Sequence, residues 1–418
     1  MSGGESPAFR DAARFWFKLG LISFGGPSGQ IAIMHSELVE KRKWISEERF
    51  LQALNFCMLL PGPEAQQLAA YCGWLLHRTW GGIVAGSLFF LPAAVLLWIL
   101  SYVYMAFGNV PDIVAVFDGL KSAVLAIVMV AVIRIGTKAL KTPDRWGLAV
   151  AAFVGIFFFK LPFPLIVFSA ALIGWLMGRG KKPDSGSDPK EQLEELKGLP
   201  AWKVIVFGAL IWVAPVLGFH AWLGLDHAIV QEGLFFSKAS MVTFGGAYAV
   251  LPYVGQQAVE VHGWMDEGQM MDGLGLAETT PGPLVMVLQF VGFVGGWQNP
   301  GDLSPVMAAT LGAFITTWVT FVPCFIWIFL GAPHVERLRG HPGWSAALSA
   351  VTAAVVGVIL NLAIWFGLHV LVPEDGPFNW FGLIVSIVAF VGMYRFKWDV
   401  VPVVLGAGVL GWLKMFLL

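Results

Sequence analysis

The chain of 418 residues is 57% hydrophobic and only 13% charged, whereas charged residues make up about a quarter of an ordinary soluble domain. With a mean hydropathy of +0.73, this composition excludes a soluble globular protein. It predicts an all-α polytopic membrane protein that has the lipid bilayer as its surroundings and no nucleic acid as a partner. The formal net charge of −1 adds little, because in a membrane protein the placement of charge matters more than its sum.

Apolar stretches long enough to span a bilayer recur along the whole chain. In the first half we expect segments at 13–34, 51–77, 79–107, 113–137, 146–160 and 163–178. In the second half we expect them at 230–256, 269–297, 305–331, 345–371, 380–394 and 400–417. We therefore divide the chain into a first transmembrane repeat (1–178), a cytoplasmic linker (179–202), one extra transmembrane helix (203–222) and a second repeat (223–418).

The two halves share a sequence motif at a constant spacing. The stretch KLGLISFGGP at 18–27 recurs as KASMVTFGGA at 238–247, an offset of 220 residues. At the same offset Phe15, Trp44, Glu47, Pro61, Gly62 and Pro63 match Phe235, Trp264, Glu267, Pro281, Gly282 and Pro283. A fixed period of this length indicates a repeat of a whole structural unit.

Two segments in each half are interrupted, one by Gly-Gly and the other by Pro-Gly-Pro. Proline removes a backbone donor, and the residue before it avoids helical angles, so these positions break a helix. Broken backbone at membrane depth is tolerated only where protein or a water-filled cavity satisfies the freed polar groups. We therefore expect broken or re-entrant helices.

The distribution of lysine and arginine predicts the topology. If the broken segments turn back at mid-depth, the amino terminus and the basic loop at 41–49 both lie in the cytoplasm, as the positive-inside rule requires. The extra helix then delivers the second repeat to the opposite face, where the loops at 223–233 and 257–268 contain no lysine or arginine. The halves are thus predicted to form inverted-topology repeats, a plan found in many secondary transporters.

The four breaks predict a binding site for an anion near the middle of the membrane. A helix amino end presents unpaired N–H groups and the positive end of the helix dipole. The competing interpretation is that the glycines only permit close helix packing. The candidate substrate-binding residues are Lys18, Ser23, Gly25, Gly26, Pro27, Pro61, Gly62, Pro63, Glu64, Gln66, Lys238, Thr243, Gly245, Gly246, Thr280, Pro281, Gly282 and Pro283.

Three charged candidates among these have alternatives. Lys18 and Lys238 would attract an anion to each mouth of the pathway, or they would only extend to the membrane surface. Glu64 would be a protonatable group that competes with substrate, or a simple cap at the start of a helix. Outside this set, Asp118 and Lys121 lie one turn apart and are expected to neutralise each other.

The sequence offers no motif for a metal, a cofactor or a catalytic centre. Its three cysteines and eight histidines lack metal-ligand spacing, and no phosphate-cradling loop or hydrolase motif is found. We therefore expect neither a cofactor nor an enzyme. The polar, mixed-charge start of the chain also leads us to expect no signal peptide.

The paired motifs resemble those of the chromate transporter family in its bidomain form. The resemblance rests on KLGLISFGGP with NFCMLLPGPEAQQ in one half and KASMVTFGGA with GLAETTPGPLVMV in the other. It implies that the Gly-Gly and Pro-Gly-Pro residues, together with Gln66, contact the substrate. Ala247 and Leu284 stand where the first half has Pro27 and Glu64, so the two halves need not contact it equally.

The resemblance implies an inner-membrane carrier that exports chromate, with alternating access around a midplane site. The driving force would be the membrane potential or a proton gradient. A sulfate or other oxyanion transporter, including an importer, is the alternative, and a homodimer is possible. An anion channel and a membrane enzyme are the competing classes, and the absence of a cluster of reactive groups argues against the enzyme.

Overall fold

The computed structural model describes residues 7–23, 26–58, 60–108, 110–178, 199–244, 247–334, 342–372 and 377–417. Regular secondary structure in these ranges is entirely helical. Five helices are long and apolar enough to cross a membrane, at Glu64–Phe107, Pro111–Ala139, Ala201–Leu223, Pro305–Gly331 and Ala346–Leu371. The all-α polytopic fold class is therefore confirmed.

The first half follows the expected segments closely. Its helices are α1 (Phe9–Ile22), α2 (Gly26–His35), α3 (Glu47–Cys57), α4 (Glu64–Phe107), α5 (Pro111–Ala139), α6 (Pro143–Phe157) and α7 (Phe163–Gly178). Helices α5 and α6 begin with proline, which is tolerated in a first turn because no N–H is needed there. Helix α4 contains non-helical backbone at His77 and Arg78, so it consists of two helices joined by a sharp bend. That bend lies where the sequence predicted a boundary between two segments.

An extra helix, α8 (Ala201–Leu223), precedes the second half. The helices that follow are α9 (Ala228–Val242), α10 (Ala247–Gly255), α11 (Glu267–Thr279), α12 (Val287–Gln298), α13 (Pro305–Gly331), α15 (Pro342–Leu371), α16 (Trp380–Arg395) and α17 (Val400–Leu417). Most of the predicted linker, at 179–198, lies outside the described residues.

Structural details of the two halves recur at the sequence offset of 220. Helix α2 continues into a π-helical turn at Ser36–Lys41, and α10 into one at Gln256–Val261. In the first half the guanidinium of Arg42 lies 4.9 Å from the ring of Trp44. In the second, the ring of His262 stacks on Trp264 with centroids 4.3 Å apart. The repeat found in the sequence is thus a repeat of local structure.

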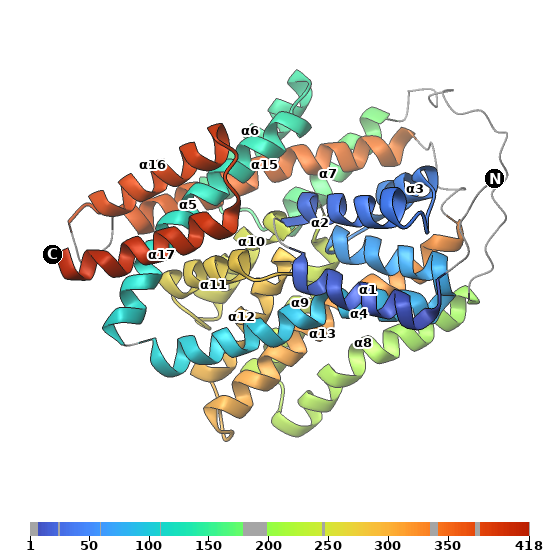
Figure 1. The fold of residues 1–418 in the computed structure, drawn as a ribbon, viewed down its shortest axis with the longest axis horizontal. Coiled ribbons are helices and arrows are strands. Elements are labelled where there is room, and N and C mark those ends of the chain that lie inside the picture. Colours follow the sequence, from blue (N-terminus) through green and yellow to red (C-terminus); the bar gives the residue numbers. More distant parts are fainter. Residues whose placement is uncertain are drawn as a thin grey trace.

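The halves are intertwined rather than placed side by side. Helices α16 and α17 pack against α5 of the first half, and this group forms the left side of Figure 1. Correspondingly, α6 and α7 pack against α15 of the second half. Each long helix, α5 or α15, therefore holds the last two helices of the other half.

Helix α8 presents apolar side chains outward along its length. Phe207, Leu210 and Leu217 are each more than half exposed, and α8 packs on one side against α9 and α13. Apolar groups on the outside of a membrane protein meet lipid tails, so this exposure does not oppose stability. Helix α8 is one of the helices long and apolar enough to cross a membrane.

Candidate functional site

The breaks of the two halves are joined to each other by backbone hydrogen bonds. The N–H of Gly62 in the first Pro-Gly-Pro donates to the carbonyl of Thr243 at 2.7 Å. At the equivalent place the N–H of Gly282 donates to the carbonyl of Ser23 at 2.8 Å. Each Pro-Gly-Pro therefore contacts the Gly-Gly segment of the opposite half. The breaks thus form two pairs, and each pair crosses between the repeats.

Glycine is required at the centre of each Pro-Gly-Pro. Gly62 has a φ of +121° and Gly282 a φ of +107°, angles that side chains of L-residues rarely adopt. A Cβ on Gly62 would lie 2.7 Å from Cys324 Sγ, and a Cβ on Gly282 would collide with Ala93. The backbone can therefore form the crossing hydrogen bonds only without a side chain at these two positions.

Helices begin directly after the breaks. Helix α2 starts at Gly26 and α4 at Glu64, while α10 starts at Ala247 and a 3-10 turn at Leu284 leads into α12. The first N–H groups of a helix have no intrahelical partner, and the dipole makes this end positive. Each pair of breaks therefore has two positive helix ends beside it, and such an arrangement favours an anion.

The helices that end at the Gly-Gly breaks have their carbonyl groups occupied. The hydroxyl of Ser23 donates to the Leu19 carbonyl at 2.6 Å, and that of Thr243 to the Ala239 carbonyl at 2.6 Å. The carbonyls of Ser23 and Thr243 themselves accept the crossing bonds described above. Ser23 and Thr243 thus neutralise carbonyl groups that would otherwise repel an anion.

Three buried glutamines surround the breaks. Gln30 Nε2 donates to the carbonyl of Gly282 at 2.5 Å, and Gln67 Nε2 donates to that of Pro61 at 2.7 Å. Both side-chain polar atoms of Gln66 lack a hydrogen-bond partner among the described residues, although Gln66 is fully buried. A buried amide costs free energy when it is unpaired, so Gln66 is well suited to bind a polar solute.

The remaining predicted residues fall into three groups. Gly25, Gly245 and Gly246 lie outside the described residues. Pro27, Pro61 and Glu64 are half-buried, whereas Pro63, Thr280, Pro281 and Pro283 are buried. The Thr280 hydroxyl donates to the Ala277 carbonyl at 3.1 Å and so closes the end of α11.

The two predicted lysines are exposed on equivalent faces of α1 and α9. No described hydrogen bond or ion pair joins Lys18 or Lys238 to the breaks. Lys238 lies close enough to His262 to influence it, since burial first and the charge of Lys238 second lower the pKa of this imidazole. His262 begins the loop between the π-helical turn and α11. The exposure of both lysines fits a mouth better than the centre of the pathway.

The two hairpins that follow the Gly-Gly breaks are packed differently. In the second half, α10 buries seven of its nine residues and contacts α15, while α11 contacts α5 and α17. In the first half, α2 and α3 pack chiefly against α4. Helix α11 buries eight of its 13 residues and α3 only four of its 11. One hairpin is thus closed against the bundle, and the other is held chiefly by α4.

Sequence reasoning missed the buried Asp272. Tyr104 of α4 donates a hydrogen bond to Asp272 Oδ2 at 2.9 Å, and Lys121 Nζ lies 3.6 Å from the same oxygen. The predicted pair of Asp118 and Lys121 is present at 3.7 Å, but it is only part of this cluster. Tyr248, at the start of α10, donates to Glu278 near the second Pro-Gly-Pro.

Glu232 of α9 is a further buried carboxyl group that the sequence did not single out. It is fully buried, and neither of its oxygens has a partner among the described residues. Its carboxyl group faces Gly295 of α12 and Gly312 of α13, where a Cβ on Gly312 would lie 2.8 Å from Glu232 Oε2. The two glycines therefore make room for this side chain.

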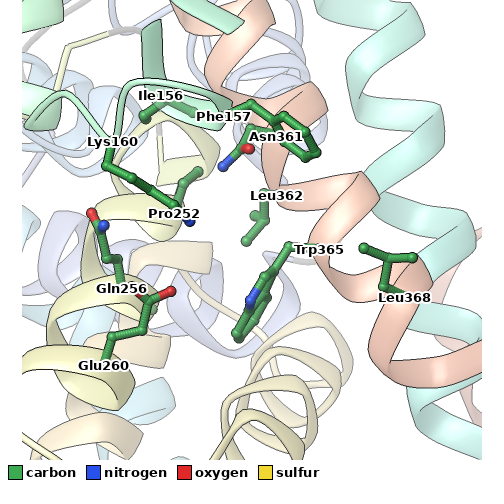
Figure 2. Close-up of a pocket in the computed structure, with 11 residues that line it drawn as sticks. Ile156, Phe157, Lys160, Pro252, Gln256, Glu260, Asn361, Leu362, Trp365 and Leu368 are labelled. Atoms are coloured by element: carbon green, nitrogen blue, oxygen red, sulfur yellow. The ribbon is translucent and has the colours of Figure 1, made fainter. Parts of the chain in front are cut away.

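A separate cavity of about 140 Å³ lies where α6, α10 and α15 meet. Figure 2 shows Lys160, Gln256, Glu260 and Asn361 among the residues that line it. None of the residues predicted to bind substrate lines this cavity. In the described part of the chain, no cluster of three or more potential metal ligands was found.

All four breaks lie in the part of the chain that matches a known family. A family described as "Chromate transporter" matches residues 10–175 and 230–412, which include both halves and omit the linker and α8. This chain belongs to the chromate transporter family. The family comprises transporters rather than enzymes, and the apolar helices agree with a multi-pass membrane protein.

Relatives of this family member cover most of its length. The chain is 31% identical to a chromate transport protein of Pseudomonas aeruginosa over 96% of this chain and 91% of the relative. It is 29% identical to a probable chromate transport protein of Synechococcus elongatus, over 91% of this chain and 90% of the relative. The chain is 28% identical to a chromate transport protein of Cupriavidus metallidurans, over 85% of this chain and 82% of the relative. No solved structure matches the chain.

Proposed function

We propose that this protein exports chromate across the inner membrane by alternating access around the four breaks. The observation that carries the proposal is the pair of backbone bonds between Gly62 and Thr243 and between Gly282 and Ser23. Each bond places two helix amino ends beside one pair of breaks. A tetrahedral dianion would receive hydrogen bonds there from backbone N–H groups and from glutamines such as Gln66.

Alternating access is supported by the difference between the two hairpins. The hairpin of α10 and α11 is packed against the bundle, whereas the equivalent hairpin of α2 and α3 packs chiefly against α4. If the repeats are inverted in the membrane, the first hairpin opens toward the cytoplasm and the second toward the outside. The structure would then be closed outside and open inside, and exchange of the two arrangements would produce the outward-open state.

The membrane potential is sufficient to drive export. Moving one charge across 100 mV is worth about 2.3 kcal/mol, so an inside-negative potential of roughly 150 mV gives about 7 kcal/mol for a dianion. At about 1.4 kcal/mol per tenfold change, this supports a gradient on the order of 10⁵. Export therefore needs no ATP site, although a proton gradient would serve as a second driving force.

Sulfate transport is the second candidate. Sulfate is also a tetrahedral dianion, and backbone N–H groups distinguish poorly between two anions of similar shape and charge. The departures at Ala247 and Leu284 make the second half less polar than the first.

The test is chromate flux in proteoliposomes with an imposed potential, in the presence and absence of sulfate. Saturable, potential-dependent flux is expected, and it should be lost in Gly25→Val and Gly245→Val because a side chain would obstruct the approach of the anion. Gly218→Val is the matched control, since a Cβ on Gly218 of α8 meets no atom within 4 Å. If both break variants transport at the rate of the control, the breaks are packing devices. Absence of flux in the unsubstituted protein would refute the proposed function.

A further inference from the structure

The cluster around Lys121 joins three helices of the bundle. Its ammonium lies 3.6 Å from Asp272 of α11 and 3.7 Å from Asp118 of its own helix, α5. Tyr104 of α4 holds the same Asp272 oxygen through its hydroxyl group at 2.9 Å. The closed hairpin is thus tied to the bundle by charge as well as by apolar packing.

Asp272 and Lys121 depend on each other in this arrangement. The Asp272 side chain is 5% exposed, that of Lys121 is 24% exposed, and that of Asp118 is 50% exposed. The buried Asp272 is therefore the principal partner of Lys121, because an exposed pair with Asp118 contributes little. Removing one member of a buried pair leaves an uncompensated charge, which is strongly unfavourable inside a membrane.

The first half shows the surroundings of the equivalent residue in a hairpin that packs chiefly against α4. At the offset of 220, Asp272 corresponds to Gln52 of α3. Gln52 is half-buried, and its amide donates to Glu48 at 3.2 Å on the exposed face of α3. A helix α11 that adopts the arrangement of α3 would therefore carry Asp272 away from Lys121 toward water.

We propose that Lys121 is a second binding site for the transported oxyanion, occupied by the Asp272 carboxylate in this conformation and by the dianion when α11 withdraws. The inference rests on the proposed function. An ammonium group serves as a point charge for a tetrahedral oxyanion. Once Asp272 has left, Lys121 keeps only the half-exposed Asp118, and a dianion leaving the breaks would take the place of Asp272. Return of Asp272 would then displace the dianion to the outside.

The first turn of α11 lies beside Lys121. A Cβ on Gly268, in the first turn of α11, would lie 3.5 Å from Lys121 Nζ, so glycine allows the ammonium to approach the helix. Asp266 is engaged as the cap of α11, because its Oδ1 accepts the N–H of Gln269 at 2.7 Å. Asp266 is therefore less available than Asp272 as a partner for Lys121.

The test measures equilibrium binding of labelled chromate to the purified protein, followed by flux in proteoliposomes. Asp272→Asn removes the competitor for Lys121, so we expect chromate to bind about fivefold more tightly or better, the size of an ordinary coupling effect. Flux should fall, because displacement of the bound dianion is lost. Lys121→Gln should weaken binding, and the double variant should show no tightening. Asp112→Asn is the matched control on the same helix, since Asp112 accepts a hydrogen bond from Trp412 away from the cluster.

Several outcomes would overturn the inference. Unchanged affinity in Asp272→Asn, or tightening that persists in the double variant, would show that the dianion does not meet Lys121. If Asp272→Asn does not purify as a monodisperse protein, Tyr104→Phe takes its place, because it removes one hydrogen bond that holds Asp272 and should tighten binding in the same direction. Normal chromate flux with these negative results would reject the inference and leave the proposed function intact.

Discussion

At the residue scale, the essential contacts of the candidate site are made by the backbone at two glycines. Gly62 and Gly282 have positive φ, and each donates its N–H to a carbonyl of the other half. Left-handed backbone costs a non-glycine residue roughly 1–2 kcal/mol, and the collisions of a Cβ with Cys324 or Ala93 add to this cost. The two glycines thus determine both local geometry and the contact between repeats.

We predict that Gly62→Ala and Gly282→Ala each lower the thermal unfolding temperature and reduce chromate flux. The reason is the combined cost of strained backbone and a displaced neighbour, about 1–3 kcal/mol in total. Thermal unfolding of the purified protein in detergent measures the stability, and Gly218→Ala is the control for a glycine in open space. Unfolding temperatures equal to that of the control would show that the breaks tolerate a side chain.

A second residue-scale prediction concerns Glu232. Its carboxyl group is fully buried, both oxygens lack described partners, and helices α12 and α13 carry no charged side chain. The neighbouring α8 carries two charged or titratable side chains, His220 and Lys203. His220 is exposed, and the Lys203 ammonium lies 5.6 Å from the Trp202 ring. Tyr248 of α10 is engaged with Glu278, and on α9 itself His227 caps the helix and Lys238 is exposed.

An ionised carboxylate in such surroundings is expensive, so the neutral isostere in Glu232→Gln should retain or raise the thermal unfolding temperature. Glu232→Ala should lower it by leaving a cavity, at a cost of about 2–5 kcal/mol if it resembles other large-to-small changes. Thermal unfolding of both variants decides the matter, and a strong loss in Glu232→Gln would show that the negative charge itself is needed.

The residues of the candidate site differ in how visible they are in the sequence. Glycine and proline at the breaks can be predicted because their backbone preferences are local and recur at a fixed offset. Asp272 could not be assigned in the same way, since its partners Tyr104 and Lys121 are distant in sequence. Gln30 was missed for the same reason, because its acceptor at Gly282 belongs to the other half.

At the element scale, the same hairpin occurs in two arrangements. Helices α2 and α3 share their break, their π-helical turn and their length pattern with α10 and α11. They differ in their neighbours, because only the second hairpin packs against the long helices α5 and α15. Helix positions were predictable from apolar length and breaks, whereas this difference depends on tertiary contacts that a single sequence does not display.

The difference predicts unequal accessibility at equivalent positions of α3 and α11. Leu51 is 45% exposed, whereas its counterpart Met271 is 3% exposed. In a background where Cys57, Cys72 and Cys324 are replaced, Leu51→Cys should react with a membrane-permeant maleimide much faster than Met271→Cys. Chromate that promotes the outward-open state should narrow this difference. Equal rates without substrate would show that the two hairpins are not held differently.

At the scale of the whole molecule, the two repeats are connected because each packs its last two helices against the other. Helices α16 and α17 pack on α5 while α6 and α7 pack on α15, so neither half closes its own core. The positions of the helices were predictable, because apolar length and breaks mark them in the sequence. The exchange of the last two helices was not predictable from the sequence, because those helices could bury their apolar faces equally well against either half.

The orientation of the two halves in the membrane is the prediction on which the direction of opening depends. An odd number of crossings between equivalent points inverts the second repeat, and the absence of lysine and arginine from the loop at 257–268 agrees with an external position. Ser46 and Asp266 are equivalent residues, each the cap of the helix that follows its π-helical turn.

In the cysteine-free background, an impermeant maleimide added outside intact cells should label Asp266→Cys and leave Ser46→Cys unlabelled. Permeabilised cells provide the control, because both positions should then react. Labelling of both variants from outside, or of Ser46→Cys alone, would place the first hairpin outside. The closed hairpin of α10 and α11 would then have to be reassigned to another face.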